Sequence, residues 1–182
     1  MTIAVSPRYD AAKLSSGALP DKIDVFEDQM RGWLIEPARI MTGYPHAGFA
    51  ILAVVLSYFE PIGQFLDGRV GASSKQFTKG FQAVFPSASA VPPVVFDELY
   101  NQLRCGMFHR GITKAKVLVG HGLKEPLSVV LNGPDVTSIT VDPWLMIDAI
   151  DGHLANYVAQ LRNVANVDKR SAFEAWFNAR AA

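Results

Sequence analysis

The sequence predicts a mainly α-helical protein, an up-and-down helical bundle with a small antiparallel β-hairpin or three-stranded insert. Two patterns predict this class. Apolar residues recur at spacings of three and four over most of the chain, as they do on one face of a helix. Between about residues 115 and 141 the chain instead has short runs rich in β-branched residues, separated by turn signals. The 182 residues, 49% of them hydrophobic, suit one domain with a sizeable core.

Composition sets the expected domain boundaries. Residues 1–20 are rich in Ser, Gly and Pro, and we expect them to form a loosely ordered N-terminal arm. We expect residues 21–182 to form a single helical-bundle domain, with the β insert at about residues 115–141. The N-terminus has no apolar core of the signal-peptide type, and the apolar stretch 47–59 is shorter than the about 20 residues that span a bilayer. We therefore expect a cytoplasmic location and no membrane contact.

Prolines and capping residues set the helices before the insert. Asp21 can cap a first helix, which we expect to end before Pro37. Pro45 suits the first turn of a second helix, which Pro61 is expected to stop. A third helix can be capped by Ser73 or by the serine after it.

The remaining elements follow from similar signals. Pro92 and Pro93 open the next helix, and Gly111 is a natural stop for it. Asp142 followed by Pro143 is a strong start for a long helix, which leads to a last helix at the C-terminus. Between these helices we expect short antiparallel strands at about 116–119, 127–131 and 138–141.

One segment, at the end of the helix that Pro92 opens, contains the candidate chemistry. Arg104 precedes His109 by five positions, which correspond to about 140° of rotation and about 7.5 Å of rise on an ideal helix. The two side chains do not share one narrow stripe, but both can lean toward one flank. Gly106, between them, lets another backbone or a substrate come close.

The stretch Arg104-Cys105-Gly106-Met107-Phe108-His109 resembles the hallmark of the HEPN superfamily. That hallmark is an Arg and a His, separated by four to six residues, on a helix of an α-helical bundle. Four residues separate Arg104 from His109, and the order of elements is also similar, with helices before the motif and a long helix after it. The resemblance implies a homodimer whose helices bring two copies of the motif together. Active members of the superfamily are metal-independent endoribonucleases.

The residue types suit that chemistry, because a ribose 2′-OH can attack the neighbouring phosphate without a metal. In this interpretation His109 is the general acid or base. Arg104 holds the nonbridging phosphate oxygens and stabilises the charge that grows on them. Arg110 and Lys114 would bind substrate by adding positive charge, which a two-fold axis would double. The expected partners are a second copy of the chain and RNA, with no cofactor and no metal.

Three alternatives remain open. Arg104, His109 and Arg110 also suit a purely structural role, since cations near a helix C-terminus interact favourably with the helix dipole. A noncatalytic helical module that binds a partner protein or a nucleotide is a second interpretation. Cys105, which stands where the superfamily often has a polar residue, and the net charge of zero favour it. The third is an unrelated helical bundle that dimerises, with an incidental motif.

The other histidines and the single cysteine show no metal-ligand spacing. We expect His46 at a helix start, His121 in an exposed turn between two glycines, and His153 on the polar side of the long helix. None of them forms an HExxH or comparable pattern. With one cysteine, Cys105, the chain can form no intrachain disulfide.

Overall fold

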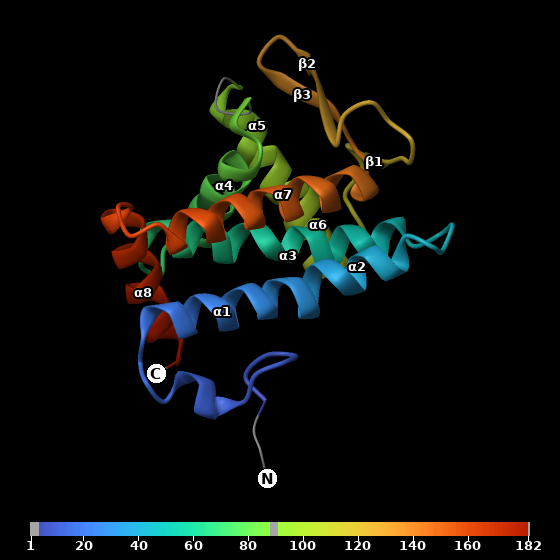
Figure 1. Cartoon of the computed structure of the whole chain (residues 1–182). Helices are drawn as coiled ribbons and strands as arrows, with labels where there is room; N and C mark the ends of the chain where they lie inside the picture. Colours follow the sequence, from blue (N-terminus) through green and yellow to red (C-terminus); the bar gives the residue numbers. More distant parts are fainter. Residues whose placement is uncertain (1–3, 88–90, 182) are drawn as a thin grey trace.

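The computed structural model describes residues 4–87 and 91–181, and it confirms a mainly helical fold with a small sheet (Figure 1). A 3₁₀ turn, Ala11–Leu14, precedes the first helix, and two π-helical turns, Arg31–Ile35 and Leu99–Arg104, join α1 to α2 and α5 to α6. The helices and strands are α1 Leu19–Met30, α2 Glu36–Met41, α3 Gly48–Asp67, α4 Ser73–Val84, α5 Pro93–Glu98, α6 Cys105–Arg110, β1 Val117–Val119, β2 Leu127–Asn132, β3 Asp135–Val141, α7 Pro143–Arg162 and α8 Val167–Ala181.

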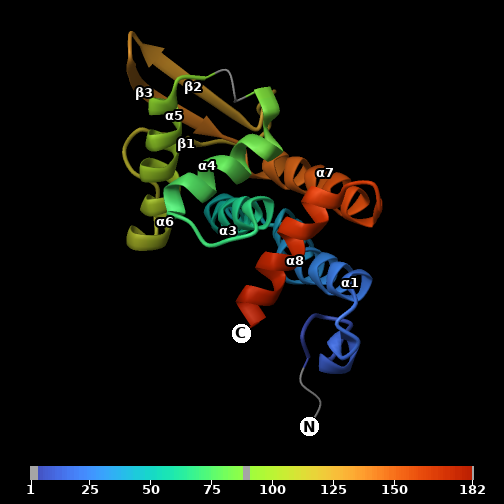
Figure 2. The same cartoon turned by 90° about the vertical axis from the view of Figure 1, so that its left-hand side faces the viewer.

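Helix α3 lies at the centre of the molecule, where it contacts α2, α4, α7 and α8 (Figures 1 and 2). Ile51, Val55 and Phe59 on this helix are completely buried. In the described part of the chain, α3 is the one helix whose length and hydropathy would suffice to cross a membrane. It is longer than the apolar stretch recognised in the sequence because the helix continues through Pro61. The sheet lies at one end of the helical body, against α5, and the N-terminal segment lies at the opposite end, below α1 (Figure 2).

Helices α3 and α4 pack in direct backbone contact at two glycines. A Cβ added at Gly63 would overlap with the backbone of Gln76, and one at Gly80 would overlap with the carbonyl of Phe59. The rings of Phe59 and Phe77 meet edge to face, with their centroids 5.6 Å apart. This close packing fixes α3 as a rigid support for the side chains on its other faces.

Pro37, which we expected to end the first helix, lies inside a longer helical segment that extends to Met41. The π-helical turn Arg31–Ile35 comes just before it, and there the amide of Glu36 donates to the carbonyl of Arg31, five residues earlier. A proline ring normally clashes with the carbonyl four residues before it. Because the π turn shifts the hydrogen-bond pattern by one residue, the helix can continue through the proline.

Pro61 is also inside a helix, and the expectation that it stops α3 was wrong. The helix begins at Gly48, not at Pro45, and runs on to Asp67. Phe65, beyond the proline, is completely buried, so tertiary packing outweighs the local cost of a proline inside a helix. Since Pro61 has no N–H, the carbonyl of Ser57 lacks its usual helical donor.

The sheet is mixed, with strand order β1-β3-β2. Strands β2 and β3 form the expected antiparallel hairpin, in which Val129 lies opposite Ile139. Strand β1 instead runs parallel to β3, with Val117 opposite Ile139, so the antiparallel prediction was wrong for this strand. Because β2 occupies one edge of β3, β1 pairs with the other. The chain reaches β1 from the end of α6, after turning back across the motif helix. In this turn the amide of Lys114 donates to the carbonyl of Gln102 at 3.1 Å. The direction of β1 follows from that path.

Residues 4–18, most of the segment that we expect to form a loosely ordered arm, pack against α1; residues 1–3 of that arm lie outside the described residues. The buried carboxylate of Asp28 accepts hydrogen bonds from the Ser6 hydroxyl at 2.6 Å and from the Arg8 amide at 2.8 Å. It also pairs with the guanidinium of Arg8. Burial alone would raise the pKa of Asp28, but these hydrogen bonds outweigh it and lower the pKa below its usual range.

The start of α7 is confirmed at Asp142 and Pro143. The buried carboxylate of Asp142 accepts hydrogen bonds from the amides of Trp144 and Leu145, at 3.0 and 3.3 Å. It also accepts one from the amide of Leu123 at 3.0 Å. One side chain therefore caps the helix and ties the connection between β1 and β2 to it.

Candidate functional site

The motif lies at the end of the helical segment 93–110, which ends where the sequence predicts. Gly111 has a left-handed backbone, with φ 74°, and its amide donates to the carbonyl of Met107 at 3.1 Å. The π turn Leu99–Arg104 comes directly before α6, so Arg104, its last residue, lies at the start of that helix. His109 consequently lies in the last turn of that helix.

Gly106 allows the chain to turn back across the motif helix. A Cβ at this position would lie 3.0 Å from the carbonyl oxygen of Ile112, 3.0 Å from the amide nitrogen of Lys114 and 3.1 Å from the Cα of Thr113. The close approach expected at Gly106 is therefore made by the chain's own backbone. It holds Lys114, half-buried, beside the motif.

Arg104 has a fixed, partly buried position between α3 and its own helix. Its Nη2 donates to Oε2 of Glu60 at 2.9 Å, and the two side chains are 23% and 19% exposed. Its guanidinium lies over the rings of Tyr100 and Phe108, with its Cζ 5.6 and 5.2 Å from their centroids. These rings stand one turn before and one turn after Arg104, so the ion pair and both aromatic contacts orient the guanidinium together.

A pocket of about 250 Å³ lies beside this ion pair. Helix α3 contributes Ser57, Glu60 and Gln64 to its wall, and the motif helix contributes Arg104 and Phe108. Phe108 is 49% exposed, and the guanidinium of Arg104 lies over one face of its ring. The pocket therefore combines a cation, a carboxylate, an amide and an aromatic ring.

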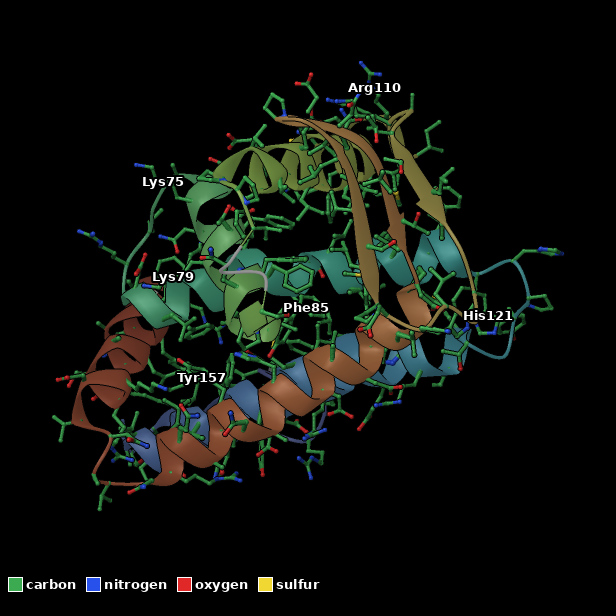
Figure 3. All side chains as sticks on the ribbon, turned by 90° about the horizontal axis from the view of Figure 1, so that it is seen from above. Lys75, Lys79, Phe85, Arg110, His121 and Tyr157 are labelled. Atoms are coloured by element: carbon green, nitrogen blue, oxygen red, sulfur yellow. The ribbon has the colours of Figure 1, made fainter. Side chains whose placement is uncertain are left out.

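His109 and Arg110 lie outside that pocket, in solvent. Figure 3 shows Arg110 projecting outward from the end of the motif helix, on the opposite side of the view from Tyr157 of α7. Across the ranges 4–87 and 91–181, no side-chain hydrogen bond or ion pair involves His109 or Arg110. The structure thus joins Arg104 to Glu60 and leaves His109 outside the pocket, on a different flank of the same helix.

Glu60 is the site residue that sequence reasoning missed. It lies 44 positions before Arg104 in the sequence. Because we expected the helix to end at Pro61, Glu60 was not recognised as a residue inside a continuous α3. Because the helix continues, Glu60 and Gln64 stand one turn apart on one face. A signal was present, since Glu60 is the only charged residue between Gly48 and Leu66. A lone charge in an apolar helix requires a partner.

A second polar cluster surrounds His153, which we had expected on the polar side of α7. The residue is half-buried instead, and its Nδ1 lies 2.8 Å from the hydroxyl of Tyr58. Its ring stacks on that of Tyr157, with a centroid distance of 6.0 Å. Burial, with a further contribution from the charge of Lys169, lowers the pKa of His153 to about 4. The imidazole is therefore neutral near pH 7.

The other two histidines are exposed. His46 lies in the turn before α3. His121 lies in the predicted turn, where its ring contacts that of Trp144 at an interplanar angle of 46°, with a centroid distance of 4.2 Å. In the part of the chain that the structure describes, no three His, Cys, Asp or Glu side chains gather in a way that could hold a metal ion.

The comparisons with known proteins show no relative of this chain. No family model matches the sequence, and no curated protein and no solved structure matches it significantly. Function must therefore be argued from the site itself.

Proposed function

We propose that this chain is a homodimeric, HEPN-like endoribonuclease that cleaves RNA without a metal ion, with Arg104 and His109 as its catalytic residues. The observation that carries the proposal is the fixed guanidinium of Arg104 at an open pocket, five positions before an exposed histidine on the same helix. Glu60 accepts one of the N–H bonds of Arg104. A guanidinium has five, so donors remain for a phosphate.

The proposed reaction is an internal phosphoryl transfer. The ribose 2′-oxygen forms a bond to the neighbouring phosphorus, the bond from phosphorus to the 5′-oxygen breaks, and a cyclic phosphate and a 5′-hydroxyl result. His109 moves the proton, and Arg104 stabilises the charge on the nonbridging oxygens. With two copies of the motif near a two-fold axis, one imidazole accepts the proton of the 2′-hydroxyl and the other donates a proton to the 5′-oxygen.

Positive charge beside the motif supports binding to a polyanion. Arg110 is exposed at the end of α6, and Lys114 lies next to the same helix. These two residues would contact phosphates that flank the cleaved bond, which makes binding weaker as salt increases.

The test is cleavage of an RNA of mixed sequence in the presence of EDTA. We expect products with a 5′-hydroxyl, and a loss of about 100-fold or more in rate for both Arg104→Ala and His109→Ala. Arg69→Ala and His46→Ala, which alter an exposed arginine and an exposed histidine elsewhere, are matched controls and should retain full activity. Cleavage that survives His109→Ala, or that stops in EDTA, contradicts the proposal.

The Glu60–Arg104 ion pair favours a second candidate, a noncatalytic module that binds a partner protein or a nucleotide. Glu60 offsets the charge of Arg104, and the structure leaves His109 outside the Arg104 pocket. Such a module would bind a nucleotide at Arg104 with no turnover in the same assay. Cleavage that depends on both motif residues would exclude it.

A further inference from the structure

The pocket beside Arg104 has the size and the walls of a site for one nucleobase. Its volume of about 250 Å³ is below the roughly 300–1,000 Å³ typical of pockets that enclose a whole drug-sized ligand, so it suits a single flat group. Phe108 lines the pocket and is 49% exposed, and the part of its ring that the Arg104 guanidinium does not cover offers a surface on which a base can stack. Base recognition in single-stranded RNA commonly combines such stacking with hydrogen bonds to the edge of the base.

The α3 wall of this pocket presents the carboxylate of Glu60 beside the side-chain amide of Gln64, which can both donate and accept. Oε2 of Glu60 accepts from Arg104, and no described residue donates a hydrogen bond to its Oε1. The ion pair with Arg104 and the low exposure of the Glu60 side chain hold the carboxylate in one orientation. Ser57 lines the same pocket, and its carbonyl lacks a helical donor because Pro61 has no N–H.

The carboxylate of Glu60, as an acceptor in this wall, favours guanine over the other bases. The pairing edge of guanine presents two adjacent donors, at N1 and at the exocyclic N2. Adenine and cytosine present a ring-nitrogen lone pair at this edge, which a carboxylate repels, and uracil presents one N–H between two carbonyls. A carboxylate that is ionised and partly desolvated strengthens the discrimination.

We propose that the pocket formed by Glu60 and Phe108 binds a guanine base adjacent to the phosphate that Arg104 holds. Glu60 reads the N–H edge of the base, and Phe108 stacks on its face. The inference deepens the proposed function, since it relies on Arg104 as the phosphate-binding group, but base binding can be measured without any cleavage.

The experiment is a calorimetric titration of the full chain with the 5′-monophosphates of guanosine, adenosine, cytidine and uridine. We expect the guanosine nucleotide to bind at least about tenfold more tightly than the other three. Glu60→Gln should abolish that ratio. Glu27→Gln is the matched control, because Glu27 is 21% exposed and is also paired with arginines, but lies on α1; it should leave the ratio unchanged.

A second pair of variants tests the stacking face. Phe108→Ala should weaken all four nucleotides about tenfold and keep the preference for guanosine, because stacking does not depend on base identity. Phe49→Ala, at a phenylalanine of similar exposure (43%) near the start of α3, should change neither. Thermal unfolding of each variant verifies that it folds. If Glu60→Gln is unfolded, Glu60→Asp serves instead, and it should reduce the ratio without reversing it.

The outcomes separate this inference from the proposed function. Equal binding of the four nucleotides, no binding of any, or a preference that persists in Glu60→Gln overturns the guanine site. RNA cleavage without a base preference also contradicts the guanine site, but it supports the proposed nuclease activity. A guanosine preference that requires Glu60, in a protein that cleaves no RNA, supports the base pocket and contradicts the nuclease.

Discussion

Protonation of His153 is expected to make the stability of the folded protein depend on pH. Its pKa in the folded protein is about 4, mainly because of burial, against an unfolded value of about 6.5. Well above pH 6.5 the imidazole is neutral in both states, and its contribution to stability is complete. As the pH falls from about 6.5 to about 4 the unfolded state binds the proton first, so that contribution is lost, by up to about 3 kcal/mol.

The measurement is urea unfolding at about pH 7 and about pH 4.5. We expect wild type to lose more stability between these values than a His153→Gln variant, which has no proton to bind. His46→Gln, at an exposed histidine, should keep the full pH dependence of wild type. A His153→Gln variant with the same pH dependence as wild type would show that His153 does not titrate in this way.

Two buried tyrosines next to His153 should respond in opposite ways to the same change. The hydroxyl of Tyr58 is bonded to His153, so Tyr58→Phe should cost about 1 kcal/mol. The hydroxyl of Tyr157 is buried and has no partner among the described residues, so Tyr157→Phe should be neutral or stabilise by up to about 1 kcal/mol. The free energies of unfolding of the two variants and of wild type, measured at pH 7, test this prediction. Equal losses would imply that the Tyr157 hydroxyl is satisfied in solution.

These residues show which side-chain roles the sequence could reveal. Asp142 and Gly111 bond to amides or carbonyls within four positions of themselves, and their roles as helix start and helix stop were predicted. The partners of Arg104 and His153 lie 44 and 95 positions away. Those pairs depend on how the helices pack, and spacing along the chain does not contain that information.

At the scale of elements, the contact between α3 and α4 depends on glycine. A Cβ at Gly80 would overlap with the backbone of Phe59, which no rotamer change relieves, so Gly80→Ala should destabilise the fold by about 3 kcal/mol. The matched control is Gly152→Ala in α7, where nothing lies within 4 Å of the new Cβ. It should stabilise by about 0.5–1 kcal/mol because alanine favours a helix. Denaturant unfolding measures both. Similar effects of the two changes would contradict the backbone contact.

The elements also show where local sequence rules failed. Pro37 and Pro61 are each a sound reason to end a helix, yet both are inside one. A π turn in the first case and buried residues beyond the proline in the second outweigh the local preference. The type of each strand was predicted from β-branched residues, but the direction of β1 was not. The direction of β1 depends on where the preceding helix, α6, ends and on how the chain turns after it.

For the whole molecule, the proposed function depends on association. Arg104 lines the pocket and His109 lies outside it, so the proposal needs a second copy to bring in the groups that one chain does not place together. Apolar surface is present at this end of the helix outside the pocket, since Ile112 is 61% exposed. An exposed isoleucine beside the motif is compatible with the proposed two-fold contact, because its burial would favour association.

We therefore expect the protein to sediment as a dimer, and Ile112→Glu to weaken that dimer and RNA cleavage together. A charge at the two-fold axis meets its own copy, and the repulsion adds to the loss of apolar contact. Val164→Glu is the matched control, since Val164 is an exposed apolar residue in the connection between α7 and α8; it should leave both the dimer and cleavage intact. Analytical ultracentrifugation at a series of concentrations, with cleavage assayed at the same concentrations, tests the link. A monomer with full activity would contradict the composite site, because a single chain would then have to place His109 beside the Arg104 pocket unaided.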